Sequence, residues 1–182
     1  MAGELRLYRI AVPAAPSGRP DLTEGQPASQ PRTMRFDERF RDATWEWFRD
    51  PELRRLTGAK EQTKEEQAAW FESLPSRPDY RIWGVELDGR PAAVFGLKAI
   101  RADAATWFVF IGDAELRGRG LGAYMGSEVR RLAAELGIRH LRNRLQASNE
   151  AIVNLHRSVG FELAETAEDG FIPVHLDLQG EP

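Results

Sequence analysis

A glycine-rich segment between a strand pattern and a helix pattern constrains the fold of this chain more than any other feature. Residues 106–112 (TWFVFIG) are β-rich and apolar at successive positions, which is typical of a central strand buried on both faces. Residues 117–122 (RGRGLG) follow, and apolar side chains then recur at helical spacing over residues 121–136. The first amides of such a helix have no partner within it, and the helix dipole adds positive charge. The arrangement therefore favours binding of an anion such as a diphosphate.

The composition of this segment indicates which diphosphates fit. Gly118, Gly120 and Gly122 let the backbone approach a ligand without interference from Cβ atoms, and Arg117 and Arg119 add positive charge. A nucleotide-binding Walker loop would end in Gly-Lys-Ser or Gly-Lys-Thr, and neither is present. A dinucleotide fingerprint needs the spacing G-x-G-x-x-G in a first βα unit, whereas this segment reads G-x-G-x-G and lies late in the chain. Both nucleotide interpretations are disfavoured.

The remaining patterns predict a mixed α/β domain. Asp88-Gly89 tolerates the positive φ angles of a tight turn, so residues 81–87 and 92–100 are expected to form a hairpin. Thr63 and Glu66 match a helix capping box, followed by a helix to about Leu74. That helix is expected to bury Ala69, Trp70 and Leu74. Further strands are expected over residues 5–12, 138–147, 161–164 and 171–178, and helical segments over residues 36–50 and 150–159.

Length and composition are those of a single globular domain. The 182 residues suffice for one core, and residues 13–33 form a Pro-rich loop that is long for a compact domain. There is no apolar run long enough for a membrane span and no signal-like start, so a cytoplasmic protein without membrane association is expected. The chain has no cysteine, which excludes disulfides and thiolate chemistry. Its net charge of −3 argues against a nucleic-acid partner.

Two segments together resemble the GNAT superfamily of N-acetyltransferases. Arg117, Gly120 and Gly122 match the family pattern R/Q-x-x-G-x-G/A. Residues 149–161 (NEAIVNLHRSVGF) resemble a later family segment, in which an Asn opens a helix and Gly-Phe begins the next strand. The resemblance covers residues 83–178, and more loosely 44–74. It implies a GNAT fold, which is a twisted mixed sheet of about seven strands with helices on both faces.

The resemblance also implies a co-substrate, acetyl-CoA, and roles for particular residues, with no metal. The amides of the glycine-rich segment would hold the coenzyme pyrophosphate. Phe110 and Ile111 would pair through their backbones with the pantetheine arm, and Asn149 would hydrogen-bond the pantetheine or the substrate. His156 lies where many relatives carry a tyrosine that protonates the departing thiolate. The implied coenzyme-binding residues are Phe110, Ile111, Arg117, Gly118, Arg119, Gly120, Leu121, Gly122, Asn149 and His156.

The acid and base of the reaction are open at this stage. The imidazole of His156 titrates near neutrality and can act as a general acid, although a satisfied histidine on a half-buried helix face is the alternative. Glu86 and Asp113 are candidate bases, directly or through water. Either is also consistent with an ordinary surface or capping carboxylate.

The acceptor half of the chain looks like a GNAT branch that contains ribosomal-protein N-terminal and nucleotide-amino-sugar acetyltransferases. We expect a small-molecule amine, favoured over a protein N-terminus, and within that class a nucleotide-linked amino sugar. Trp45 and Trp70 would offer a surface for the base and Arg81 a donor for the diphosphate. The alternatives are tryptophans that only fill the core, an N-terminal or polyamine acetyltransferase, and a catalytically silent CoA-binding module. A homodimer is compatible with the sequence.

Overall fold

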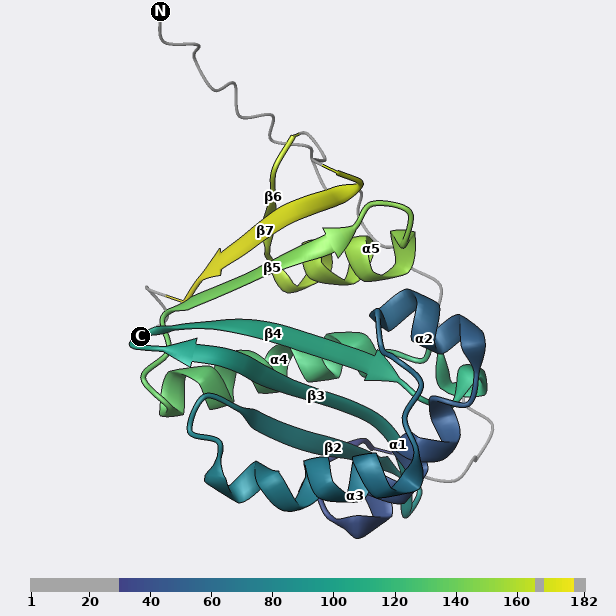
Figure 1. Ribbon diagram of the computed structural model, residues 1–182. Coiled ribbons are helices and arrows are strands. Elements are labelled where there is room, and N and C mark those ends of the chain that lie inside the picture. The colour runs from purple at the N-terminus through teal and green to yellow at the C-terminus, as the bar shows by residue number, and fades with distance from the viewer. Residues whose placement is uncertain (1–29, 166–168, 179–182) are drawn as a thin grey trace, which may run out of the picture.

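The computed structural model describes residues 30–165 and 169–178, which form a seven-stranded mixed sheet with helices on both faces (Figure 1). The strands are β1 (Arg32–Arg35), β2 (Arg81–Leu87), β3 (Arg90–Arg101), β4 (Ala104–Ile111), β5 (His140–Gln146), β6 (Glu162–Leu163) and β7 (Phe171–Asp177). The α-helices are α1 (Glu38–Trp47), α2 (Pro51–Thr57), α3 (Lys64–Ser73), α4 (Leu121–Glu135) and α5 (Glu150–Val159). Short 3-10 turns, η1 (Leu74–Ser76) and η2 (Ala114–Leu116), complete the description. The expected α/β fold is confirmed.

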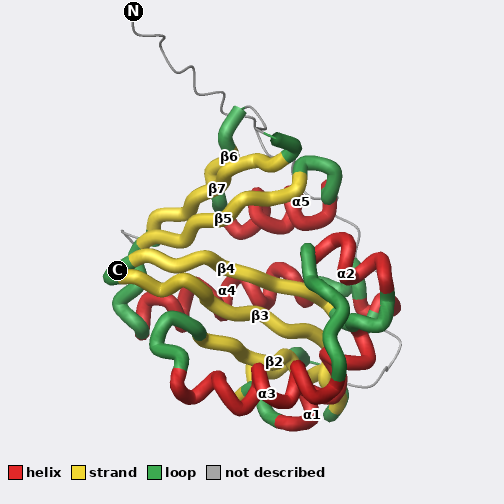
Figure 2. Tube along the Cα trace, viewed as in Figure 1, coloured by secondary structure: helices red, strands yellow, loops and turns green. Residues whose placement is uncertain are grey.

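The order of strands across the sheet is β1-β2-β3-β4-β5-β7-β6. Every neighbouring pair is antiparallel except β4 and β5, which run parallel. The parallel pair lies in the middle of the sheet, and the connection between its strands is helix α4 (Figure 2). The expectation that residues 106–112 form a central strand is therefore confirmed.

Strand β1 was not expected from the sequence. Arg32–Arg35 pairs antiparallel with β2, from Arg32 opposite Glu86 to Arg35 opposite Trp83. The predicted Pro-rich loop over residues 13–33 is therefore wrong at its end, because β1 already begins at Arg32. The rest of that loop, and the strand predicted over residues 5–12, lie outside the described residues apart from positions 30 and 31.

Local signals in the sequence place several elements as expected. Asp88 and Gly89 have φ angles of 53° and 76° and join β2 to β3. Thr63 and Glu66 form both hydrogen bonds of the capping box at the start of α3. The predicted burial of Ala69 is wrong, since Ala69 is exposed and the buried residue of α3 is Gln67.

Two apolar clusters cover the two faces of the sheet. Val94 and Phe95, which are neighbours on β3, belong to different clusters. Val94 packs with Phe36 and Phe40 on the face covered by α1 and α3. Phe95 belongs to the larger core on the face covered by α4 and α5. Figure 1 shows α1 and α3 in front of the sheet and α4 behind it. The same alternation holds along β4, where Trp107 and Val109 pack in the larger core and Phe108 packs in the smaller cluster on the opposite face. No helix of the described residues is long and apolar enough to cross a membrane.

Candidate active site

The parallel strands β4 and β5 separate after a short paired stretch. Their register runs only from Ala104 opposite His140 to Thr106 opposite Arg142, and the remainder of each strand has no partner in the other. Figure 1 shows the two strands diverging beyond this point. The middle of the sheet is therefore open between the carboxyl halves of β4 and β5.

Hydrogen bonds show which peptide groups of β4 face this gap. Gly112 donates its amide hydrogen to the carbonyl of Ala92 on β3, at 3.1 Å. The carbonyl of Trp107 instead accepts from the side chain of Asn143 on β5, at 2.7 Å. Because a strand's peptide groups alternate in direction, those of Val109 and Ile111 face the gap and those of Phe110 face β3. The expected backbone pairing of Ile111 is compatible with this geometry. The peptide groups of Phe110 face β3 instead, although Phe110 lines the cavity, and those of Val109 face the gap.

A cavity of about 980 Å³ passes through the gap and reaches both faces of the sheet. On the α4 and α5 face it is lined by the glycine-rich segment, by Val109 and Ile111, and by α5. On the other face it is lined by aromatic side chains from β4 and α3, together with residues of α1 and α2. Residues from both faces of the sheet therefore line one cavity, whose part on the α4 and α5 face is called the first chamber and whose part on the other face the second.

The glycine-rich segment opens α4 with free backbone donors. Gly118 and Gly120 have φ angles of 77° and 82°, a conformation that side chains with a Cβ rarely adopt. Gly120 is the N-cap and supplies no side-chain acceptor. Among the described contacts, the amides of Gly120, Leu121 and Gly122 have no protein acceptor. Gly122 also lies against α5, since a Cβ there would be 2.8 Å from Leu155.

The two arginines of this segment differ in position. Arg117, Gly118, Gly120 and Gly122 line the cavity, and Arg119 does not. Arg119 is exposed and donates its amide hydrogen to the carbonyl of Leu116. Both arginines were expected to bind the coenzyme, and of the two only Arg117 lies on the cavity wall.

Asn149 is held at the start of α5. Its side-chain oxygen accepts from the amide of Ile152 at 3.2 Å, which makes Asn149 the N-cap of the helix. The residue also lines the cavity beside Ile152. Asn149 therefore both fixes the start of α5 and forms part of the cavity wall.

His156 is fully buried on α5 and has a defined tautomer. Nδ1 lies 2.9 Å from the carbonyl oxygen of Ile152, which only accepts, so Nδ1 carries the hydrogen. Nε2 lies 3.4 Å from Nδ2 of Asn143 and accepts from it. Burial lowers the pKa of His156 from 6.5 to about 4, against a smaller opposing effect of the Ile152 carbonyl. At neutral pH the imidazole is uncharged and has no hydrogen on Nε2.

Asn143 is the residue that sequence reasoning missed. It lies on β5 and lines the cavity where the two strands part. Its neighbours Arg142 and Arg144 alternate with Leu141 and Leu145 as in an ordinary half-buried strand, so nothing in the local pattern marks it. A polar residue at an inward position of that alternation was the one available signal.

The second chamber is aromatic. Trp70, Tyr80 and Phe108 contact one another edge-on or tilted, with ring centroids 6.3 and 5.4 Å apart for the two pairs. All three line the cavity. Burial raises the pKa of Tyr80 to about 12, so its hydroxyl stays protonated. The predicted role of Trp70 as a substrate-binding residue is compatible with this position.

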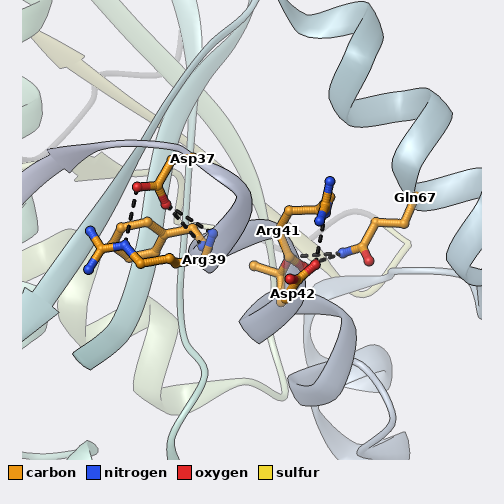
Figure 3. Close-up of polar contacts among 7 residues, drawn as sticks. Asp37, Arg39, Arg41, Asp42 and Gln67 are labelled. Carbon is orange, nitrogen blue, oxygen red and sulfur yellow. Dashed lines mark hydrogen bonds and ion pairs between the residues drawn. The ribbon is translucent and has the colours of Figure 1, made fainter.

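Gln67 provides a fixed polar group in the same chamber. Its Nε2 donates to the carbonyl of Arg41 and to the hydroxyl of Thr44, both at 2.9 Å. Figure 3 shows these bonds and the Oε1 atom directed away from them. Gln67 is buried and lines the cavity. Its oxygen is therefore an acceptor held ready for a donor in the chamber.

Four of the predicted catalytic and substrate-binding residues do not line the cavity. Glu86 forms an ion pair with Arg39 at 3.1 Å, and Asp113 caps η2 by accepting from the amide of Glu115. Trp45 lies beneath the cations Lys64 and Arg49, and Arg81 donates to backbone carbonyls at Arg77, Pro78 and Tyr80. The structure therefore does not bring Glu86, Asp113, Trp45 or Arg81 into the site.

The charged side chains that line the cavity are all basic. They are Lys98, Arg117 and Arg144, and no aspartate or glutamate in the described part of the chain lines it. The described part of the chain also contains no group of three or more His, Asp or Glu side chains arranged to hold a metal ion. The cavity suits anionic groups at both ends.

Comparison with known proteins identifies the family. The model of the acetyltransferase (GNAT) domain matches residues 32–162. A search of curated protein sequences gave no match.

Solved structures show the same fold at low sequence identity. The N-acetyltransferase PseH of Campylobacter jejuni is 16% identical, with a TM-score of 0.64 over 82% of this chain and 99% of that one. The spermidine N-acetyltransferase of Vibrio cholerae, solved with CoA and spermine, is 12% identical, with a TM-score of 0.73 over 82% and 96%. An N-acetyltransferase of Staphylococcus aureus is 23% identical, with a TM-score of 0.68 over 83% and 100%.

The matched region contains the glycine-rich segment and the diverging strands β4 and β5, all of which contribute residues to the cavity wall. The chain therefore belongs to the acetyltransferase (GNAT) family.

Proposed function

We propose that this chain transfers the acetyl group of acetyl-CoA to a primary amine through the gap between β4 and β5. The observation that carries the proposal is the single cavity that joins the free amides at the start of α4 to the aromatic chamber on the opposite face. A diphosphate fits the first end, and an amine-bearing molecule fits the second. The two reacting groups meet where the strands part.

The coenzyme is assigned to the α4 and α5 face. The amides of Gly120, Leu121 and Gly122, with Arg117, donate hydrogen bonds to the pyrophosphate. The pantetheine arm then pairs with the peptide groups of Val109 and Ile111, as a strand would. One of these amides donates to the carbonyl oxygen of the thioester and stabilises the charge that develops on it during attack.

The amine is proposed to react as its free base. No carboxylate of the described residues lines the cavity, and burial keeps Tyr80 protonated and His156 neutral over the physiological range. Proton loss therefore occurs to water before or during binding. The rate should rise with pH according to the pKa of the acceptor amine itself, while the orientation of the two substrates supplies much of the acceleration.

A nucleotide-linked amino sugar is the acceptor that we favour, in line with the branch that the sequence resembles. Trp70, Tyr80 and Phe108 offer faces for a base, and Gln67 Oε1 accepts from a hydroxyl or amine. Lys98 and Arg144 replace Arg81 as the cations for a diphosphate. A polyamine is less suited, because a polycation would find basic side chains and no carboxylate along the wall.

Thiol release from acetyl-CoA, measured with a thiol reagent, tests the proposal. The chain has no cysteine, so the signal reports released CoA alone. The panel contains nucleotide-linked amino sugars, simple aminohexoses, peptides with free N-termini, and spermidine. Turnover with the nucleotide-linked sugars supports the assignment. Turnover with spermidine alone overturns the acceptor class, and CoA binding without turnover of any amine favours a silent binding module.

A further inference from the structure

A side-chain amide takes the place of a backbone hydrogen bond where β4 and β5 part. The last paired residues are Thr106 and Arg142. At the next position the Oδ1 atom of Asn143 accepts from the amide of Arg144 at 2.8 Å, and its Nδ2 donates to the carbonyl of Trp107 at 2.7 Å. The carboxamide thus connects a donor of β5 to an acceptor of β4 that would otherwise face each other across the sheet.

This arrangement holds the strands apart. Paired strands lie about 4.8 Å from each other because their peptide groups bond directly. A carboxamide between Arg144 and Trp107 satisfies both backbone groups while adding the length of a side chain. Pairing therefore ends here without leaving unsatisfied backbone groups, and the next peptide groups of β4, at Val109, face the cavity.

His156 fixes the orientation of the Asn143 carboxamide. Its Nε2 accepts from Asn143, and its Nδ1 donates to the carbonyl of Ile152 on α5. The ring contacts both Trp107 and Phe161, each at a centroid distance of 4.7 Å. The described groups in hydrogen-bond or ring contact with the imidazole are Asn143, Ile152, Trp107 and Phe161, and none carries a charge. Burial therefore outweighs the Ile152 carbonyl, which favours an imidazolium, and keeps the ring neutral.

We propose that Asn143 is a positioning residue that sets the closed end of the coenzyme gap, and that His156 is a neutral acceptor holding its carboxamide. The acetyl end of the coenzyme rests against this closed end, so Asn143 fixes the depth of the thioester relative to the amide of Val109. His156 acts through Asn143 and does not protonate the leaving thiolate. The inference rests on the proposed acetyl transfer.

The first test replaces Asn143 by leucine, whose side chain has a similar size but can neither donate nor accept a hydrogen bond. We expect kcat to fall about thirtyfold because a small displacement of the thioester spoils the attack geometry. The Kd of CoA, measured by calorimetry, should change less than about threefold because its pyrophosphate contacts remain. Arg142→Leu, on the same strand and exposed, is the control. An Asn143→Leu enzyme with unchanged kcat overturns the proposed role of Asn143.

The second test asks whether His156 acts as a neutral hydrogen-bond acceptor for Asn143 or as a general acid. Gln at this position keeps an acceptor for Asn143 and a donor for Ile152 but cannot carry a charge, whereas Leu keeps neither bond. We expect His156→Gln to retain kcat within about threefold with an unaltered pH–rate profile, and His156→Leu to lose about thirtyfold. A hundredfold loss in His156→Gln together with a missing limb of the profile identifies an acid and overturns the assignment.

Two readouts remain informative even if the panel contains no acceptor. Nitrogen-15 NMR of the three histidines should show one that is protonated on Nδ1 and does not titrate above pH 5. Hydrogen exchange at the Arg144 amide should accelerate in Asn143→Leu relative to Arg142→Leu. A titrating His156, or unchanged exchange at Arg144, contradicts this proposal and leaves the proposed acetyl transfer untouched.

Discussion

The indole of Trp47 packs directly on the backbone of Gly112, where a Cβ atom would lie 1.8 Å from Cδ2 of the ring. Gly112 follows the last residue of β4, and Trp47 ends α1. The contact therefore ties α1 to the strand end that leads into the glycine-rich segment.

Gly112→Ala is expected to destabilise the protein by about 3 kcal/mol, because the methyl group displaces Trp47 from a packed position. Gly58→Ala is the control: Gly58 has a φ of 68° and open space, so that variant suffers only backbone strain of about 1 kcal/mol. Urea unfolding measures both. In a Trp47→Leu background the cost of Gly112→Ala should shrink, and an equal cost in both backgrounds would refute the steric explanation.

Stability should fall at acid pH because His156 is buried in its neutral form. Its pKa is about 4 in the folded protein against 6.5 in the unfolded chain, so the unfolded state binds more protons between these values. The contribution is complete above pH 6.5 and decreases by about 3 kcal/mol as the pH falls to 4. The difference between wild type and His156→Gln, followed by urea unfolding from pH 7 to 4, isolates this effect from the carboxylates. Parallel curves for the two proteins would contradict it.

Gly120→Trp is expected to abolish tight CoA binding. The side chain would enter the space in front of the α4 amides, and losing two charge-assisted hydrogen bonds weakens binding by about a hundredfold. Gly137→Trp is a matched control, since Gly137 follows the other end of α4 with a φ of 72° and equally open surroundings. Calorimetric titration with CoA compares the two. Similar affinity in both variants would place the pyrophosphate elsewhere.

Charge reversal at Lys98 should weaken an anionic acceptor. The expected rise in KM is roughly tenfold, because an exposed ion pair is worth up to about 1 kcal/mol and the new carboxylate repels the diphosphate. The effect should diminish as salt is added. Lys64→Glu serves as the control, since Lys64 lies over Trp45 outside the cavity. A lower KM for an anionic acceptor in Lys98→Glu would reverse the assignment.

The carboxylates that the sequence suggested as bases are expected to be dispensable for turnover. Glu86→Gln removes only an exposed ion pair with Arg39, and Asp113→Ala removes the cap of η2 at a cost of about 1 kcal/mol in stability. We expect kcat of both variants within about twofold of wild type, since neither side chain reaches the reacting groups. A hundredfold loss of kcat in either variant, with stability intact, would identify a base.

The elements predicted correctly from the sequence are those whose ends are marked by local signals in the sequence itself. Helix α5 runs over the predicted residues 150–159 because Asn149 caps its start and Gly160, with a φ of 99°, ends it. Strand β1 was missed because its pairing with β2 comes from tertiary contact, and RTMR shows little pattern of its own. Ala69 was misplaced because the inward face of α3 is set by the hydrogen bonds of Gln67.

The candidate site, too, could be predicted from the sequence only in part. The glycine-rich segment is contiguous, so its glycines and Arg117 can be recognised in the sequence. The aromatic chamber collects Trp70, Tyr80 and Phe108 from distant elements, and its charge balance appears only when the lining is known. The pairing of Asn143 with His156 spans 13 positions and two elements, so neither residue alone indicates it.

The cavity that passes through the sheet bears on the order in which the two proposed substrates bind. Because residues from both faces of the sheet line it, the proposed coenzyme and amine would each enter from a face of their own. Neither would have to leave before the other arrives. We therefore expect direct transfer from the thioester to the amine within a ternary complex, rather than through an acetylated form of the chain.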